Sequence, residues 1–154
     1  MDFKKLANQY RDELLDNVLP FWLEHSQDLE FGGYFSCLDR EGKVFDTDKF
    51  IWLQGREVWM FSMLYNKVEK RQEWLDCAVQ GGEFLKKYGH DGNYNWYFSL
   101  DRSGRPLVEP YNIFSYTFAT MAFGQLSLAT GNQEYADIAK KTFKIILSKV
   151  DNPK

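Results

Sequence analysis

Two adjacent charged residues, Arg56 and Glu57, interrupt a long apolar segment and are the first candidates for chemistry in this sequence. Between residues 50 and 66 they are the only charged side chains. A helix that is apolar on all sides must be buried on all sides, and a buried guanidinium needs an anionic or polar partner. Glu57 would point about 100° away along the helix, so it is a poor partner. Arg56 therefore either faces a polar cavity or pairs with a distant carboxylate.

The composition limits the classes of protein that are compatible with such a site. The chain has 154 residues, of which 44% are hydrophobic and 27% charged, as in one ordinary soluble domain. A formal net charge of -3 provides no basic patch, so neither nucleic acid nor a membrane surface is an expected partner. The aromatic share of 18% suits a carbohydrate site and a packed core equally well.

The N-terminal segment and the cysteines indicate the compartment. The first residues predict an amphipathic helix rather than a signal peptide, and no segment is long and apolar enough to span a bilayer. Without a secretory signal, Cys37 and Cys77 are interpreted as free thiols in a reducing environment, and their spacing matches no metal motif. We therefore expect a cytoplasmic protein without a bound metal.

Hydrophobic periodicity predicts helices of two alternating kinds. Residues 50–68 and 112–130 are apolar on nearly all sides, and the second segment contains no charged residue. Residues 3–19, 72–88 and 133–150 each carry a single apolar stripe. Helices buried on all sides alternate with helices buried on one side, which predicts two layers, one inside the other.

Turn residues punctuate these helices. Short β-hairpins are predicted at residues 34–45 and 96–108, each across a turn that contains glycine. Asp46, Thr47 and Asp48 are N-cap candidates for the helix that contains Arg56. Near Pro20 we expect the first helix to be interrupted or bent.

Glycines weaken the third helix. Gly81 and Gly82 fall inside the segment 72–88, where glycine costs helical stability. We expect another part of the backbone to pack closely there.

The two halves of the sequence repeat. A Leu-Asp-Arg segment with a following glycine occurs at residues 38–42 and again at 100–104, an offset of 62 positions. A fixed period of this kind is typical of repeat architectures. The simplest object with a repeated inner and outer helix is an all-α protein of the α/α barrel type. Two repeats cannot close a barrel, so we expect residues 1–154 to be the N-terminal portion of one larger barrel domain, or to assemble with copies of itself.

Several motifs resemble one enzyme family over most of the chain. They are PFWLEHSQDLEFGGYFSCLDREGKVFDTDKFIWLQGREVWMFSMLYN at residues 20–66, AVQGGEFL at 78–85, LDRSGRPLV at 100–108 and NIFSYTF at 112–118. The sequence is similar to the N-acylglucosamine 2-epimerase family, also called renin-binding proteins. The resemblance implies an (α/α)6 barrel of six helix pairs. It also implies interconversion of N-acetylglucosamine and N-acetylmannosamine.

The implied reaction makes specific demands on side chains. Inverting C2 of a ring-opened sugar requires a base on each face of the carbon, for which histidine is suited. The enediolate intermediate needs fixed positive charge or hydrogen-bond donors. By resemblance Arg56 occupies the family's active-site arginine position and would stabilise that anion.

Further substrate-binding residues are implied around Arg56. Trp52 lies four residues earlier on the same helical face and could stack on the sugar, although core packing explains it as well. At the start of the second enclosed helix, Tyr111, Ser115 and Tyr116 are candidate hydrogen-bond partners of the substrate.

The catalytic bases are not found in this chain. His25 is expected to cap or to form a local hydrogen bond, and His90 to be solvated in a glycine-rich loop. In the family the paired histidines and a carboxylate belong to the later half of the barrel. We therefore expect no epimerase activity from this chain alone.

The resemblance also implies partners and leaves alternatives open. An amino sugar is the expected ligand, a nucleotide such as ATP an expected activator, and a homodimer the expected assembly, although the sequence contains no GxxxxGK[ST] phosphate loop. Alternatives are a cellobiose 2-epimerase, an aldose–ketose isomerase on the same scaffold, or a non-catalytic protein-binding module.

Overall fold

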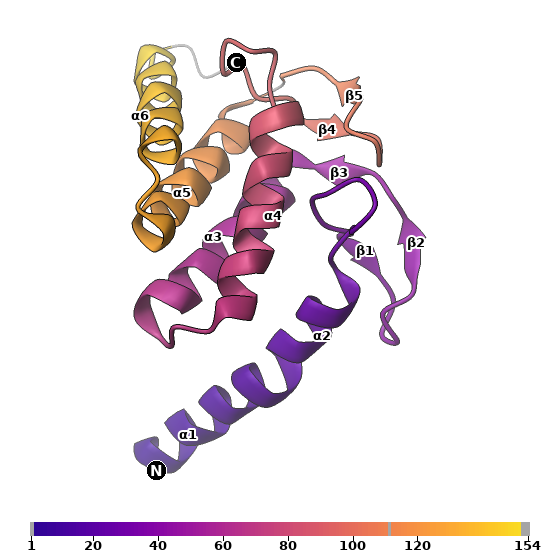
Figure 1. Ribbon diagram of the computed structural model, residues 1–154, viewed down its shortest axis with the longest axis vertical. Helices are drawn as coiled ribbons and strands as arrows, with labels where there is room; N and C mark the ends of the chain where they lie inside the picture. The colour runs from indigo at the N-terminus through magenta and orange to yellow at the C-terminus, as the bar shows by residue number, and fades with distance from the viewer. Residues whose placement is uncertain (1, 111, 152–154) are drawn as a thin grey trace.

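Four long helices form two layers through the body of the protein (Figure 1). The structure, a computed structural model, describes residues 2–110 and 112–151. One layer contains α3 (Ile51–Lys67) and α5 (Ile113–Thr130), which pack against each other. The other contains α4 (Gln72–Tyr88), which packs on α3, and α6 (Gln133–Ser148), which packs on α5. The predicted all-α class and its two layers are confirmed.

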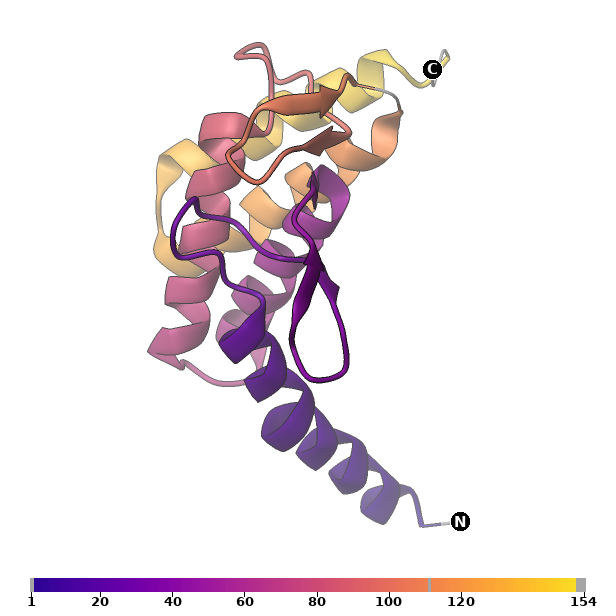
Figure 2. The same cartoon turned by 90° about the vertical axis from the view of Figure 1, so that its right-hand side faces the viewer.

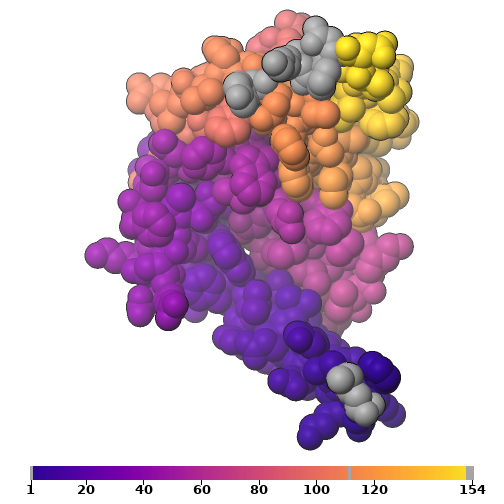
Figure 3. Space-filling view, turned by 180° about the vertical axis from the view of Figure 1, so that it is seen from behind, coloured from indigo at the N-terminus to yellow at the C-terminus, as the bar shows by residue number. Residues whose placement is uncertain are grey.

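The N-terminal helix extends away from this body, as the view from behind shows (Figure 3). It consists of α1 (Phe3–Glu13), a π-helical turn (Leu14–Val18) and α2 (Leu19–His25). The predicted interruption near Pro20 is this π-helical turn, after which proline at the start of α2 needs no N–H partner. The apolar stripe expected to be buried here is exposed except for Leu19, with 75% of Phe3 and 70% of Tyr10 accessible, because no other described element covers α1.

Both small sheets lie on one side of the helical layers (Figures 1 and 2). The first pairs β1 (Cys37–Leu38) with β2 (Val44–Asp46), and the second has the order β3 (Lys49–Phe50), β4 (Ser99–Leu100), β5 (Pro106–Val108), all antiparallel. The two predicted hairpins are confirmed, whereas β3 was not predicted. Its pairing with β4 joins the first repeat to the second.

The strand β3 also explains why the expected N-caps of α3 are wrong. Neither Asp46, Thr47 nor Asp48 caps the helix, whose N-cap is Phe50 in an extended conformation. The Ile51 N–H donates instead to the Phe98 carbonyl at 3.0 Å. Strand pairing therefore satisfies a donor that a capping side chain would otherwise accept.

The sequence repeat corresponds to a repeated turn. Asp39 and Asp101 each accept a backbone N–H through Oδ1 from the residue four positions later, at 2.8 and 2.9 Å. Gly42 and Gly104 follow at φ values of +83° and +94°, which favour glycine. Each Leu-Asp-Arg segment thus closes its hairpin with the same hydrogen bonds.

A buried ionic cluster ties the second hairpin to the segment after α2. Asp28 and Lys49 are 1% and 0% exposed, and Lys49 Nζ donates to Asp28 Oδ2 at 2.9 Å. Arg102 Nε donates to the same oxygen at 3.0 Å. Lys49 Nζ also donates to the carbonyls of Gly32 and Arg102, so the ammonium is fully hydrogen-bonded without water. The cluster connects residues that lie 74 positions apart.

The glycines of α4 mark close contacts with side chains rather than with backbone. A Cβ at Gly81 would overlap the ring and hydroxyl of Tyr34, and one at Gly82 would overlap Leu126. Tyr34 is fully buried and donates its hydroxyl hydrogen to the Cys77 carbonyl at 2.7 Å. The glycines therefore make room for core side chains that enter from two directions.

Gly81→Ala is expected to destabilise the protein by about 1–3 kcal/mol, because the buried Tyr34 has no free space into which to move. Gly124→Ala in α5 is the matched control, since nothing lies within 4 Å of a Cβ at that position. The control should be neutral or up to about 1 kcal/mol more stable. Urea unfolding of both variants measures the difference, and equal midpoints would contradict the packing described here.

The inner layer keeps exposed apolar side chains in this chain. On α5, 62% of Phe114 and 70% of Leu128 are accessible. The predicted exposure of apolar flanks is confirmed for α5 but is wrong for α3, which has no large apolar side chain among the exposed ones. In the part of the chain that the structure describes, no helix is both long and apolar enough to span a membrane. Cys37 and Cys77 form no disulfide.

Candidate functional site

Arg56 lies at the surface of α3 beside a hollow of about 330 Å³. The hollow is lined by Trp22, Ser36, Leu53, Arg56, Glu57, Trp59 and Met60. Among residues 2–110 and 112–151, none accepts a hydrogen bond from the Arg56 guanidinium or forms an ion pair with it. The described residues thus include no carboxylate that clamps Arg56, and its charge is available to a ligand in the hollow.

Close packing of two helices fixes the position of Arg56. The preceding residue, Gly55, is buried, and a Cβ there would lie 3.0 Å from the backbone carbonyl of Phe118. Any side chain at this position would push the two helices apart by a few tenths of an ångström. Ile51 and Val58 on the same helix are fully buried. Arg56 is therefore held by a rigid element, as a binding residue requires.

Glu57 is the site residue that sequence reasoning missed. Its side chain lines the same hollow, and its Oε1 lies 2.5 Å from Ser26 Oγ at the end of α2. Burial raises the pKa of Glu57 to about 8. An acidic residue in an apolar helix was a sufficient signal, but Glu57 was considered only as a partner for Arg56.

Trp52 lines a second hollow rather than the one beside Arg56. This hollow has a volume of about 320 Å³ and is lined by Trp52, Phe98, Asn112, Phe114 and Phe118. The Trp52 and Phe118 ring centroids are 5.8 Å apart with an interplanar angle of 51°. Aromatic residues of both repeats therefore form one apolar surface, of a kind on which a sugar ring can stack.

The polar residues proposed at the start of α5 do not join these hollows. Ser115 and Tyr116 are only 2% and 1% exposed. The Tyr116 hydroxyl donates to Asn95 Oδ1 at 3.4 Å, and burial raises the pKa of this phenol. Because α5 is apolar all round, its sequence did not indicate which side faces the core. Tyr111 lies outside the described residues.

Neither histidine lines the hollow beside Arg56. His25 packs on Phe21, with 4.9 Å between ring centroids. His90 was expected to be solvated, but it stacks on Tyr94 at 4.7 Å, and its Nδ1 accepts the Gly92 N–H at 3.0 Å. Burial lowers the pKa of His90, so the imidazole is held neutral.

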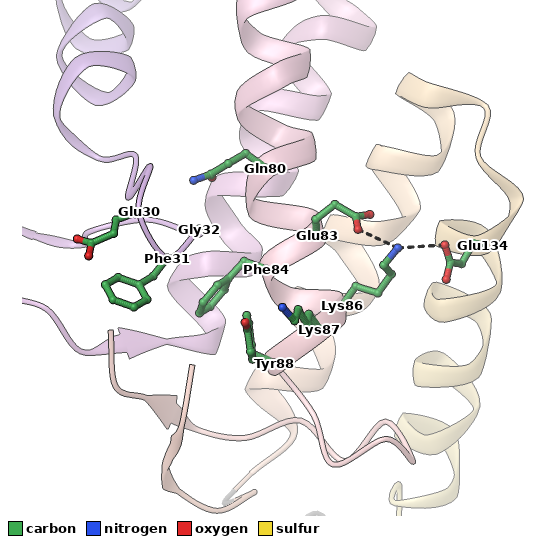
Figure 4. A pocket seen from close by; sticks show the side chains of 10 residues that line it. All are labelled: Glu30, Phe31, Gly32, Gln80, Glu83, Phe84, Lys86, Lys87, Tyr88 and Glu134. Carbon is green, nitrogen blue, oxygen red and sulfur yellow. Dashed lines mark hydrogen bonds and ion pairs between the residues drawn. The ribbon is translucent and has the colours of Figure 1, made fainter. Parts of the chain in front are cut away.

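A larger hollow of about 640 Å³ is lined by residues 30–32, by residues of α4 and by Glu134 of α6 (Figure 4). Three of its charged groups pair with each other, since Lys86 Nζ lies 2.9 Å from Glu83 and 3.1 Å from Glu134. The Tyr135 hydroxyl also donates to Glu83 Oε1 at 2.6 Å. This network links the two outer helices, and the remaining lysine of the hollow, Lys87, lies over the Tyr88 ring at 4.8 Å. Within the described ranges, no three His, Cys, Asp or Glu side chains are grouped so that they could hold a metal ion.

Comparisons with known proteins agree with these features. The family model of N-acylglucosamine 2-epimerase (GlcNAc 2-epimerase) matches residues 33–154. The N-acylglucosamine 2-epimerase of Mus musculus is 47% identical over 128 residues, which cover 80% of this chain and 30% of that protein. The Homo sapiens enzyme of the same name is 47% identical over 125 residues, 79% of this chain and 29% of that protein.

Relatives with another substrate in their names are more distant. A cellobiose 2-epimerase of Dictyoglomus turgidum is 30% identical over 148 residues, 95% of this chain and 38% of that protein. The solved cellobiose 2-epimerase of Bacillus thermoamylovorans has a TM-score of 0.83 and 31% identity, over 93% of this chain and 37% of that one. This likeness places the chain in the (α/α)6 barrel class that the motifs implied.

The chain spans about a third of the length of these relatives. The family match nevertheless covers most of the sequence and includes the helix that carries Arg56. From its sequence and its fold, the chain belongs to the N-acylglucosamine 2-epimerase family.

Proposed function

We propose that this chain forms the arginine-bearing wall of an N-acyl-D-glucosamine 2-epimerase, which interconverts N-acetylglucosamine and N-acetylmannosamine. The observation that carries the proposal is the Arg56 guanidinium, which has no partner among residues 2–110 and 112–151 and lies beside a hollow of about 330 Å³. The N-acyl sugar is preferred over cellobiose because the relatives named for N-acylglucosamine share 44–47% identity, against 30–31% for the two cellobiose 2-epimerases described above.

The chemistry assigned to Arg56 is binding and charge stabilisation. Removal of the proton at C2, next to the carbonyl of the open-chain sugar, gives an enediolate with negative charge on oxygen. A guanidinium donates two parallel hydrogen bonds to such an oxygen pair and stays charged at any working pH. Trp52 would offer an apolar face to the sugar from the neighbouring hollow.

Removal and return of the C2 proton need bases that do not belong to the hollow beside Arg56. Histidine suits the task, yet His25 and His90 do not line the hollow beside Arg56. The chain alone is therefore proposed to be inactive, and the histidines to come from the remaining length of the barrel. A nucleotide activator such as ATP and a homodimer are proposed from the family resemblance only.

A chimera tests the function. The chain would be joined to the part of the Mus musculus enzyme that its match does not cover, and assayed with N-acetylmannosamine, with and without ATP, and with cellobiose. We expect N-acetylglucosamine from the chimera, none from the 154-residue chain alone, and no product from cellobiose. A folded chimera that converts only cellobiose would favour the cellobiose 2-epimerase alternative. A folded chimera that converts neither sugar would refute the proposal.

A further inference from the structure

The hydrogen bonds around Glu57 require one hydrogen more than would be present if its carboxylate were ionised. Ser26 Oγ lies 2.5 Å from Glu57 Oε1 and 2.6 Å from the Trp22 carbonyl oxygen. Both separations are those of O–H···O hydrogen bonds. A serine hydroxyl has one hydrogen and a backbone carbonyl has none. Two such bonds at one hydroxyl oxygen therefore require a second hydrogen, which only the Glu57 carboxyl can supply.

The direction of each bond follows from this count. The Trp22 carbonyl already accepts the Ser26 N–H at 3.0 Å, and it accepts the Ser26 hydroxyl hydrogen as a second bond. This is the usual bond of a serine to the carbonyl four residues earlier in a helix. Ser26 Oγ then has free lone pairs only, so Glu57 donates to it as a protonated acid.

The surroundings of Glu57 favour the neutral form. Tyr34 from the loop before β1 and Cys77 from α4 are its other titratable neighbours. Burial, followed for Cys77 by the charge that Glu57 would carry, raises the pKa of both groups, so both stay protonated. The cation of this hollow is Arg56, and none of the ion pairs in the described residues joins it to Glu57. Nothing in this set compensates a negative charge at Glu57.

We propose that Glu57 is a neutral carboxylic acid at physiological pH and that its hydrogen bond to Ser26 anchors the end of α2 to α3. Because Glu57 is neutral, it does not compensate the charge of Arg56, which stays available to a negatively charged ligand oxygen. Glu57 is a positioning residue in this arrangement. The part that concerns the ligand rests on the proposed function, whereas the protonation state does not. Above its pKa the ionised side chain would place a negative charge in the hollow that Arg56 also lines and would weaken anion binding there.

Direct titration tests the protonation state in the chain itself. The ¹³C NMR signal of the Glu57 carboxyl carbon would be followed with pH and assigned by its loss in Glu57→Gln. We expect a midpoint near 8, which is several units above that of an ordinary glutamate. A midpoint near 4.5, the pKa of an ordinary glutamate, would overturn the proposal.

Ser26→Ala distinguishes the two possible bond directions. If Glu57 donates to Ser26, loss of the acceptor removes support for the protonated acid, and the Glu57 midpoint should fall. If Ser26 donates to a carboxylate, the same substitution should raise the midpoint, and the proposal is wrong. The sign of the change decides between them, and neither readout requires enzymatic activity.

The functional consequence is measured in the chimera by the pH profile. With a pKa near 8, kcat/KM should fall about tenfold between pH 7 and pH 9 through Glu57 alone. The amide of Glu57→Gln stays neutral and can still donate to Ser26, so this component of the pH profile should disappear. The ratio of kcat/KM at pH 7 to kcat/KM at pH 9 should therefore be about tenfold smaller in Glu57→Gln than in the chimera with Glu57. An identical profile in both proteins would refute the link between Glu57 and Arg56. An inactive chimera would refute the proposed function but leave the titration result standing.

Discussion

Arg56→Ala is expected to lower kcat/KM for N-acetylmannosamine in the chimera by about 10²–10³, the usual cost of removing one stabilising group from an oxyanion. The free energy of unfolding should change by less than about 0.5 kcal/mol, because the guanidinium is exposed and pairs with none of the described side chains. Arg56→Lys should recover only part of the loss, since an ammonium keeps the charge but cannot form two parallel hydrogen bonds. Steady-state kinetics and thermal unfolding of the same preparations measure both effects.

The control for this prediction is Arg40→Ala. Arg40 is an exposed arginine in the turn of the first hairpin and does not line the hollow beside Arg56. Its removal changes the net charge by the same amount and should leave kcat/KM within about twofold of the starting protein. Full turnover in Arg56→Ala, or an equal loss in Arg40→Ala, would show that the Arg56 position has no special role.

Asp28→Asn is expected to destabilise the fold by about 3–5 kcal/mol, because it leaves Lys49 charged, fully buried and without its anion. Burial alone would oppose ionisation of Asp28, but hydrogen bonds from Arg102 and Lys49 outweigh it and hold the pKa of this carboxyl below its ordinary value. Stability from a lowered carboxyl pKa is present above the unfolded value of 3.8 and is lost as the pH falls through the folded value. The difference in the free energy of unfolding between the starting protein and Asp28→Asn should therefore be constant near neutral pH and become smaller below about pH 4.

Urea unfolding of both proteins at several pH values measures this difference in the free energy of unfolding. Asp12→Asn on α1 is the matched control, because Asp12 pairs with Arg11 at the surface with 56% of its side chain accessible. Such pairs contribute about 0–1 kcal/mol, so the control should unfold close to the starting protein. If Asp28→Asn were as mild as Asp12→Asn, the buried cluster would not hold the hairpin to the helices.

Much of the architecture was readable from the sequence. The periodicity predicted α4 at residues 72–88 with both ends correct, and α3, α5 and α6 to within two residues. These helices are long and repeat their pattern over several turns, so the signal is strong. The strand β3 was missed because a strand of two residues has no periodicity to detect, and its pairing partner β4 is 50 positions away.

Among the candidate site residues, Arg56 lies beside a hollow and its neighbours on α5 do not. Arg56 was identified because a charge in an apolar helix needs an explanation, and the structure places it beside a hollow. Ser115 and Tyr116 were expected near a ligand, and the structure buries both side chains in the core. Polarity near a helix start does not distinguish a binding side chain from a core side chain with a partner, such as Tyr116 with Asn95.

By itself the sequence determined the helix boundaries, the two layers, the family and the candidate role of Arg56, because these depend on local periodicity and on motifs contiguous in the chain. Only the tertiary structure decided that Glu57 meets Ser26, that Lys49 meets Asp28, and that Trp52 shares a hollow with Phe118. Each of these contacts joins residues at least 21 positions apart. The protonation of a buried acid depends on which atoms surround it in space, and residue order alone does not specify them.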